Sequence, residues 1–348
     1  MIFVLSDSPL SHRKVASQIA SVLSQHTDCR LVLGMFYPST LHGTVIIVCS
    51  PHGLTNRIYE AIKSNTRIKQ IIFYATNEGR LKPSYLPQAQ YFHNGTIITP
   101  SEFCKKNFEA DGFEVAGVIP HGVEHFGEPK TQNGKIFGYM GGGLARKYPE
   151  YGVRAVEKAV AQLNIEFRVI VDRFFRRIID RNVDRAGFHE KLGYRYPLTL
   201  DKVRLRRFAK IVSDAEYELN VVTDEFILDF YRGLNWYLNL SDSEGFGITP
   251  LEAMAMGTPV IAPRYPPLTE FLPEWTLWVE TTGEIWIEEW WGWLLIQHHH
   301  YHEHEMLKTI KRAVEMSDSK YSYLSRKSIE HAKKYDVNKL YVRFLEYV

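Results

Sequence analysis

The sequence predicts an α/β protein made of two doubly wound, Rossmann-like domains with a helical C-terminus. Short β-branched runs alternate with segments whose apolar residues recur at helical spacing, and most of the runs are apolar throughout. A strand that is apolar on both faces is covered on both faces, so the pattern indicates parallel sheets wrapped by helices. The 348 residues are enough for two such domains.

The first half contains five strand-like runs, at 2–6, 30–35, 44–50, 70–76 and 96–101. A segment rich in Gly, Pro and polar residues follows at 118–135, as is typical of a connection between domains. We therefore expect a first domain over 1–126, a second over 127–330, and a last helix over 331–348 that crosses back to the first domain.

The second half repeats the alternation, with strand-like runs at 135–142, 167–172, 218–222, 236–241, 259–263 and 277–280. From about Glu284 onward we expect successive helices. The tryptophans in this region are expected to pack one helix against a sheet, and a membrane interface is the less favoured alternative: Trp286, Trp290, Trp291 and Trp293. Adjacent histidines would scatter around a helix instead of converging on a metal, so we interpret the His-rich stretch 298–304 as an exposed helix junction.

Composition excludes several classes of protein. The chain has 42 Lys and Arg against 40 Asp and Glu, so its net charge of +2 gives no reason to expect a nucleic-acid binder. The three cysteines, Cys29, Cys49 and Cys104, form no CxxC pair and favour a reducing interior. The N-terminal apolar run is too short for a secretory signal, and we expect a cytoplasmic protein.

The segment Ser241 to Pro263, SDSEGFGITPLEAMAMGTPVIAP, carries the most chemical information. It runs from a strand end through a glycine-containing turn into a helix, and open α/β sheets bind ligands at such strand ends. Glu244 in the turn and Glu252 in the helix would lie on one side of a cleft, about two helical turns apart. The backbone amides between them lie at a helix N-terminus, which favours anionic oxygen.

This segment resembles the E-x7-E motif of the family 4 retaining glycosyltransferases, which have the GT-B fold. Four further pieces occur in the order of that family: IITPSEFCKKNFEADGF, VIPHGVE, FGYMGGGLARKYPEYGVRAV and VVTDEFILDFYRGLNWYLNLS. The resemblance covers most of residues 95–348 and is weaker before them. It implies an acceptor-binding first domain and a donor-binding second domain that face a central cleft.

By this resemblance, Glu252 holds the ribose hydroxyls of a nucleotide sugar, while Glu244 addresses the donor sugar. The amides of Gly245, Phe246, Gly247 and Ile248 would address its phosphates. The competing interpretations are a helix-surface salt bridge for Glu252 and a turn carboxylate that caps the next helix for Glu244.

Lys147 matches the lysine that the family points at the donor diphosphate, where a fixed ammonium stabilises the charge of the departing group. The family usually has an arginine where this chain has Gly142, so either Arg146 supplies the second charge or the glycines there bring amides to the phosphate. The alternative for Arg146 and Lys147 is a solvated basic pair before a helix.

Two further candidates are weaker. Thr223 lies where relatives contact the nucleobase, although capping of the following helix is at least as well supported. Glu78 follows the strand 70–76 and could steer the acceptor hydroxyl or the reacting carbon, or remain a loop carboxylate in water. The loop SDSPLSH at 6–12 lacks the paired glycines of relatives, which puts its phosphate contact in doubt.

The sequence has no D-x-D pair for a divalent ion, so we expect no metal site and activity in the presence of a chelator. The basic stretch 168–210 could dock an anionic lipid-linked acceptor or membrane surface, but a solvated insertion is favoured and nucleic acid is not expected.

The resulting hypothesis is a retaining, metal-independent glycosyltransferase of the hexosyltransferase type. It would move a sugar from a nucleotide diphosphosugar, its co-substrate, to a hydroxyl of a glycan, lipid or protein. The alternatives are a nucleotide-sugar epimerase or phosphorylase of the same fold and a non-catalytic nucleotide-sugar-binding homologue.

Overall fold

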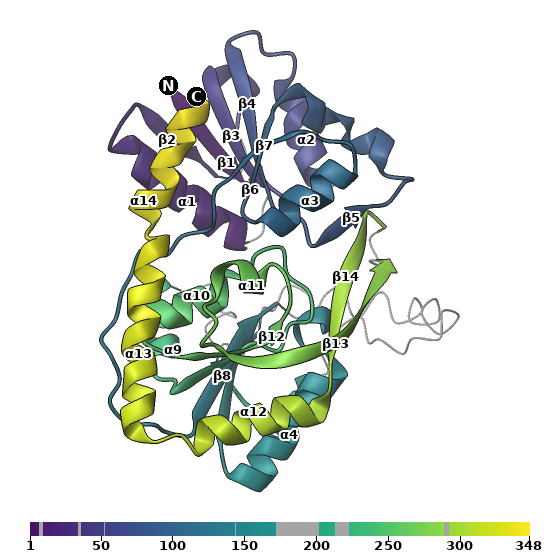
Figure 1. The fold of residues 1–348 in the computed structure, drawn as a ribbon. Helices are drawn as coiled ribbons and strands as arrows, with labels where there is room; N and C mark the ends of the chain where they lie inside the picture. The colour runs from purple at the N-terminus through teal and green to yellow at the C-terminus, as the bar shows by residue number, and fades with distance from the viewer. Residues whose placement is uncertain are drawn as a thin grey trace.

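The computed structural model describes residues 1–6, 10–33, 36–51, 53–142, 144–171, 202–212, 223–288 and 292–348. Its two sheets are stacked end to end along the molecule, with helices on their faces (Figure 1). This architecture confirms the predicted α/β fold class with two Rossmann-like sheets. Of the sequence features singled out above, the strand-like run 218–222, Trp290, Trp291 and most of the basic stretch lie outside the described residues.

The first sheet is parallel throughout, in the order β2-β1-β3-β4-β6-β7. Its strands are β1 (Ile2–Ser6), β2 (Cys29–Val32), β3 (Gly43–Cys49), β4 (Ile68–Ala75), β6 (Thr96–Thr99) and β7 (Val115–Val118). Its helices are α1 (Leu10–Ser24), η1 (Pro38–Thr40), α2 (Gly53–Ile62), η2 (Leu86–Asn94) and α3 (Glu102–Ala110). Strand β3 is apolar and buried on both faces, as its continuous apolar run predicts.

The second sheet has the order β10-β9-β8-β11-β12-β13-β14-β5. Its strands are β8 (Ile136–Gly141), β9 (Glu166–Val171), β10 (Lys210–Ile211), β11 (Trp236–Leu238), β12 (Val260–Arg264), β13 (Leu277–Glu288), β14 (Leu294–Tyr301) and β5 (Gly79–Leu81). The helical elements before the hairpin are η3 (Ala145–Lys147), α4 (Glu150–Leu163), α7 (Lys202–Leu205), α9 (Asp224–Arg232), α10 (Ile248–Ala255) and α11 (Leu268–Phe271). The strands from β10 to β13 pair in parallel, whereas β14 is antiparallel to both β13 and β5.

Strand order fixes where a ligand can bind in this sheet. From β8 the chain goes to β9 on one side, and β11 lies on the other side of β8. The chain connections therefore diverge between β8 and β11. The carboxyl ends of these two strands form the topological switch point, the place at which open α/β sheets bind ligands. The residues that follow β8 and β11 are those of η3 and of the segment leading to α10.

The expectation of successive helices from Glu284 is wrong up to Tyr301, because β13 and β14 form a hairpin there. Gly292 lies in its turn at φ +83°, a conformation that favours glycine. Along β14 burial alternates from Leu294 to His298, with Leu294 and Ile296 on the buried face, so the period is that of a strand.

The prediction of an exposed helix junction at 298–304 is wrong for the first histidines, whereas the exposed His302 and His304 do lie at the start of α12. His298 and His299 lie on β14 with only 5% and 6% of their surface exposed. Trp286 lies on β13 and is 42% exposed, so it does not pack a helix against a sheet. Trp293 packs beside Tyr85 of the first half, with ring centroids 5.9 Å apart.

The two halves are joined by β14 of this hairpin and by the C-terminal helices. Strand β5 belongs to the first half of the chain but pairs with β14, and a Cβ at Gly79 would lie 2.0 Å from the carbonyl oxygen of Leu295. The C-terminal elements are α12 (Glu303–Val314), α13 (Asp318–Ala332), η5 (Lys333–Tyr335), α14 (Val337–Tyr341) and η6 (Val342–Tyr347). Helix α13 runs up the second half and α14 lies beside α1, so both termini are at the same end of the molecule (Figure 1).

Among the described residues, none of the helices is both long and apolar enough to cross a membrane.

Candidate active site

The segment between β11 and α10, residues 239–247, lies at the switch point and is called the β11–α10 loop. Gly247 precedes α10 at φ +86°, which explains a glycine immediately before the helix. Gly245 lies against the first half, since a Cβ there would be 2.5 Å from Thr76 Cγ2. The Gly245 carbonyl accepts hydrogen bonds from Ser101 Oγ at 2.7 Å and from Cys104 Sγ at 3.0 Å. The loop is thus closely packed between the two sheets.

Lys147 and Glu244 form an ion pair at the centre of this region. Their side chains are 14% and 10% exposed, so neither is a solvated surface charge. Burial lowers the pKa of Lys147, and the neighbouring Arg146 lowers it further, whereas Glu244 opposes both effects. Glu244 does not cap α10, whose N-cap is Gly247 with no side-chain hydrogen bond.

Arg146 joins the two halves of the chain. Its Nη2 lies 2.7 Å from Glu78 Oε2 of the first half, and its Nη1 donates to the carbonyl of Ser243 at 3.2 Å. The side chains of Arg146 and Glu78 are 11% and 20% exposed. Arg146 and Lys147 are therefore not a solvated pair, and Glu78 is not a free loop carboxylate in water.

Glu252 is held by two partners on the inner side of α10. Its Oε1 lies 2.6 Å from Lys14 Nζ of α1, and its Oε2 accepts from the Tyr231 hydroxyl at 2.8 Å. With 8% of its surface exposed, Glu252 forms a buried ion pair between the halves, not a salt bridge on a helix surface. Burial opposes the charged form of Lys14, but Glu252, together with Asp224 and Glu124, raises the pKa of Lys14 above its ordinary value.

The other predicted site residues have more structural roles. Thr223 caps α9 by accepting from the Phe226 amide at 3.2 Å, as its alternative interpretation predicts. Phe246 stacks on Phe271 with centroids 4.4 Å apart, and Ile248 begins α10. A Cβ at Gly142 would meet no heavy atom of the described residues within 4 Å, so the position is open.

Sequence reasoning missed Asp242 and four side chains that contact either it or the predicted Glu252. Lys14 and Tyr231 bind Glu252, while Tyr151 and His298 bind Asp242, which lies two residues before Glu244. Lys14 and Tyr231 lie on amphipathic helices, so their roles depend on tertiary packing that periodicity does not reveal. His298 belongs to a His-rich stretch that is evident in the sequence, but the sequence analysis predicts a helix junction there and not a strand.

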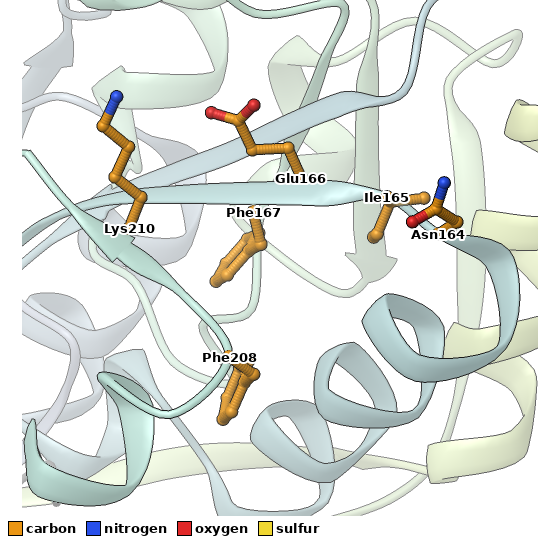
Figure 2. A pocket seen from close by; sticks show the side chains of 6 residues that line it. All are labelled: Asn164, Ile165, Glu166, Phe167, Phe208 and Lys210. Carbon is orange, nitrogen blue, oxygen red and sulfur yellow. The ribbon is translucent and has the colours of Figure 1, made fainter.

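Metal and pocket geometry add two observations. Among the described residues, no three His, Cys, Asp or Glu side chains are grouped so that they could hold a metal ion. A depression of about 540 Å³ is lined by Glu166, Phe167, Phe208 and Lys210 together with Asn164 and Ile165 (Figure 2). It lies where β9 and β10 begin, at the amino ends of the strands, and is therefore at the opposite edge from the switch point.

Comparison with known proteins identifies the class of enzyme. Residues 219–285, which include the β11–α10 loop and Glu252, match the family Glycosyl transferases group 1. The chain is 27% identical over 379 aligned positions to glycosyltransferase 335 of Sulfolobus islandicus rod-shaped virus 1, with 99% of both chains covered. It also superposes on HepE of Anabaena, in complex with UDP and glucose, with a TM-score of 0.66. The chain is a glycosyltransferase of the GT-B fold.

The structural neighbours differ in how much of their length this glycosyltransferase spans. The HepE match has 13% sequence identity and covers 99% of this chain and 98% of HepE. A mutant of S. aureus TarM, in complex with Fondaparinux, alpha-GlcNAc-glycerol and UDP, has 15% identity and a TM-score of 0.57. That match covers 87% of this chain but only 55% of TarM, so the chain spans about half of that protein. At these identities the likeness shows the fold alone.

Proposed function

We propose that this glycosyltransferase moves a hexosyl group from a nucleoside diphosphate sugar to an acceptor hydroxyl, with retention at the anomeric carbon and without a metal ion. The observation that carries the proposal is the pair of adjacent cations, Arg146 and Lys147, buried after β8 at the switch point. Both lie beside the loop that leads to the N-terminus of α10. A donor diphosphate there would meet two positive charges and a helix dipole.

The chemistry of leaving-group departure gives Lys147 its proposed role. When the bond between the anomeric carbon and the diphosphate oxygen breaks, negative charge grows on the β-phosphate. An ammonium in a buried site stabilises that charge more than it stabilises the ground state. In the described structure Lys147 pairs with Glu244, whose carboxylate would turn to the donor sugar hydroxyls when the phosphate arrives.

Glu252 is proposed to accept hydrogen bonds from the ribose hydroxyls of the donor nucleotide. A carboxylate with one oxygen on Tyr231 and the other on Lys14 has lone pairs left for a diol. Thr223 and the Gly142 turn would lie along the nucleotide, and the amides of Gly245, Phe246, Gly247 and Ile248 along the diphosphate. Since HepE was solved with UDP, UDP-sugars are the first donors to test.

Glu78 is proposed to act near the reacting carbon. It belongs to the first half, which would hold the acceptor, and Arg146 brings its carboxylate next to the proposed diphosphate site. A carboxylate at this place can stabilise an oxocarbenium-like centre or orient the acceptor hydroxyl. The acceptor would be a glycan, a lipid-linked molecule or a protein. The structural neighbour TarM, for example, was solved with alpha-GlcNAc-glycerol.

The test is release of nucleoside diphosphate from UDP-, GDP- and ADP-sugars, measured with and without candidate acceptors. We expect turnover of one donor class by the wild type and at least 100-fold less by Lys147→Ala. Lys158→Ala is the matched control, because Lys158 is exposed on α4 and pairs only with Glu303 among the interactions of the described residues. Turnover of the nucleotide sugar to an isomer without release would instead indicate an epimerase, and binding without turnover a non-catalytic homologue.

A further inference from the structure

The carboxylate of Asp242 is buried beside the proposed site, and its partners include a histidine from the His-rich stretch. His298 Nδ1 lies 2.9 Å from Asp242 Oδ1, and the Tyr151 hydroxyl donates to Oδ2 at 2.7 Å. The Asp242 amide donates to the carbonyl of Arg146 at 3.0 Å, and its own carbonyl accepts from the His299 amide at 2.8 Å. We propose that His298 is a positioning residue for glycosyl transfer, which acts through Asp242 to hold the β11–α10 loop and η3 in register.

Two carbonyls of the chain just before Asp242 accept hydrogen bonds from tyrosine hydroxyls. Tyr301, at the end of β14, donates its hydroxyl to the Leu240 carbonyl at 2.7 Å. Tyr265 donates to the Ser241 carbonyl at 2.9 Å. The path of the loop before Glu244 is thus set by hydrogen bonds to protein groups, with His298, His299 and Tyr301 of β14 among them, which makes it a preorganised segment.

Asp242 connects both proposed catalytic groups. It lies two residues before Glu244, and its amide is bonded to the backbone of Arg146, the residue before Lys147. A displacement of Asp242 therefore changes the position of the loop carboxylate and of the cations together. A shift of about 1 Å at such groups costs on the order of 10²-fold in rate.

The same strand also reaches the first half. Gln297, the residue before His298, donates its backbone amide to the carbonyl of Glu78 at 3.3 Å. His299, the residue after His298, donates its backbone amide to the carbonyl of Asp242. Three consecutive residues of β14 therefore join Glu78 to Asp242. This arrangement ties the backbone of Glu78, whose carboxylate the proposed mechanism uses, to the backbone of Asp242.

Burial explains why a histidine and a tyrosine are needed. Asp242 is 0% exposed, and an ionised carboxylate inside a protein must receive hydrogen bonds. A carboxylate only accepts, so His298 Nδ1 and the Tyr151 hydroxyl are the donors. Phenylalanine at 298 would supply no donor, whereas asparagine can place its amide nitrogen near the former Nδ1.

The inference rests on the proposed function, and its test compares four variants by donor kcat and KM and by hydrogen exchange of residues 240–248. His298→Phe should lower kcat roughly 10- to 100-fold with donor KM changed less than about threefold, and should speed exchange in that segment. His298→Asn should recover kcat to within about fivefold of wild type. Tyr151→Phe should lower kcat about fivefold, and it carries the test if His298→Phe does not fold.

Tyr321→Phe is the matched control for Tyr151→Phe. It also removes a hydroxyl, one that donates at 2.8 Å to the Asn235 carbonyl at the other end of β11, and it should change kcat less than twofold. If Tyr151→Phe and His298→Phe behave like Tyr321→Phe, or if the loss only follows the unfolded fraction, the positioning role is wrong. If the wild type neither binds nor turns over a nucleotide sugar, the proposed function fails and this inference fails with it.

Discussion

Lys14 Nζ lies 2.6 Å from Glu252 Oε1, so a helix of the first half reaches the carboxylate proposed to hold the donor ribose. The Lys14 side chain is 27% exposed and that of Glu252 is 10% exposed. Tyr231 binds the other carboxylate oxygen. Each carboxylate oxygen of Glu252 therefore accepts from one protein group, and the proposed donor binding and the contact between the halves share one carboxylate.

Replacement of Lys14 separates the contact between the halves from donor binding by Glu252. Lys14→Met leaves a buried carboxylate with one partner fewer, so the free energy of unfolding should fall by about 1–3 kcal/mol. The nucleotide hydroxyls would then replace the missing donor, and the increase in Tm on nucleotide binding should be larger than in the wild type. Lys63→Met, which removes an exposed ion pair with Glu60, should change stability by less than about 0.5 kcal/mol. Loss of nucleotide binding in Lys14→Met would show that Lys14 itself holds the nucleotide.

The lowered pKa of Lys147 predicts an alkaline limit to activity. Burial and Arg146 lower this pKa below the ordinary 10.5, and the proposed role needs the protonated form. The kcat should therefore fall as pH rises through the lowered pKa. Lys147→Arg keeps its charge at that pH, so its residual activity should not fall over the same range. A wild-type profile without an alkaline limb, or the same limb in Lys147→Arg, would contradict the role of the ammonium.

Glu78 offers a test that separates catalysis from donor binding. Glu78→Gln keeps the size of the side chain but weakens the pair with Arg146. If the carboxylate stabilises the reacting carbon, kcat should fall at least 10-fold while donor KM changes less than about threefold. Glu102→Gln, on α3 of the same half, should change neither value. A rise in donor KM with unchanged kcat would mean that Glu78 only orients Arg146.

His121 predicts that the protein becomes less stable in acid. Burial, together with the charge of His12, lowers the pKa of His121 to about 3. Above pH 6.5 the ring is neutral in both the folded and unfolded states. Below it the unfolded chain binds a proton that the folded protein excludes, and the free energy of unfolding falls progressively toward pH 3, by about 2 kcal/mol at pH 5.

The measurement is denaturant unfolding at pH 7.5 and pH 5 for the wild type and His121→Gln. The variant no longer titrates at this position, so its stability should fall by about 2 kcal/mol less between the two pH values. Because the His121 ring also packs against Phe246, the variant can be less stable at both pH values, and only the difference is compared. An equal fall in the two proteins would refute the buried neutral histidine.

The fold and the central loop could be predicted because they are local in the sequence. Strand β3 is a continuous apolar run and α10 follows a strand end through Gly245 and Gly247, so each signal lies within about ten residues. The resemblance also selected Lys147, Glu244 and Glu252, all of which the structure buries in ion pairs. Their catalytic and binding roles remain predictions.

The hairpin and the contacts across the halves could not be predicted in the same way. In β14, LLIQHHHY, apolar and polar residues do not alternate, and His298 and His299 are both buried although neighbouring residues of a strand point to opposite faces. The partner that accompanies His298 in the interior is Asp242, which is 56 residues away in the chain. The pairing of Lys14 with Glu252 spans 238 residues, a separation at which periodicity carries no signal.

Thermal unfolding with UDP-, GDP- and ADP-sugars in the presence of EDTA tests the central claim most directly, with the wild type compared with Glu252→Ala and Lys147→Ala. The account predicts that one nucleotide class raises the Tm of the wild type in EDTA and that either substitution abolishes the increase. No increase for any nucleotide, an increase that requires added divalent metal, or the same increase in both variants would contradict a metal-independent donor site built on these two residues.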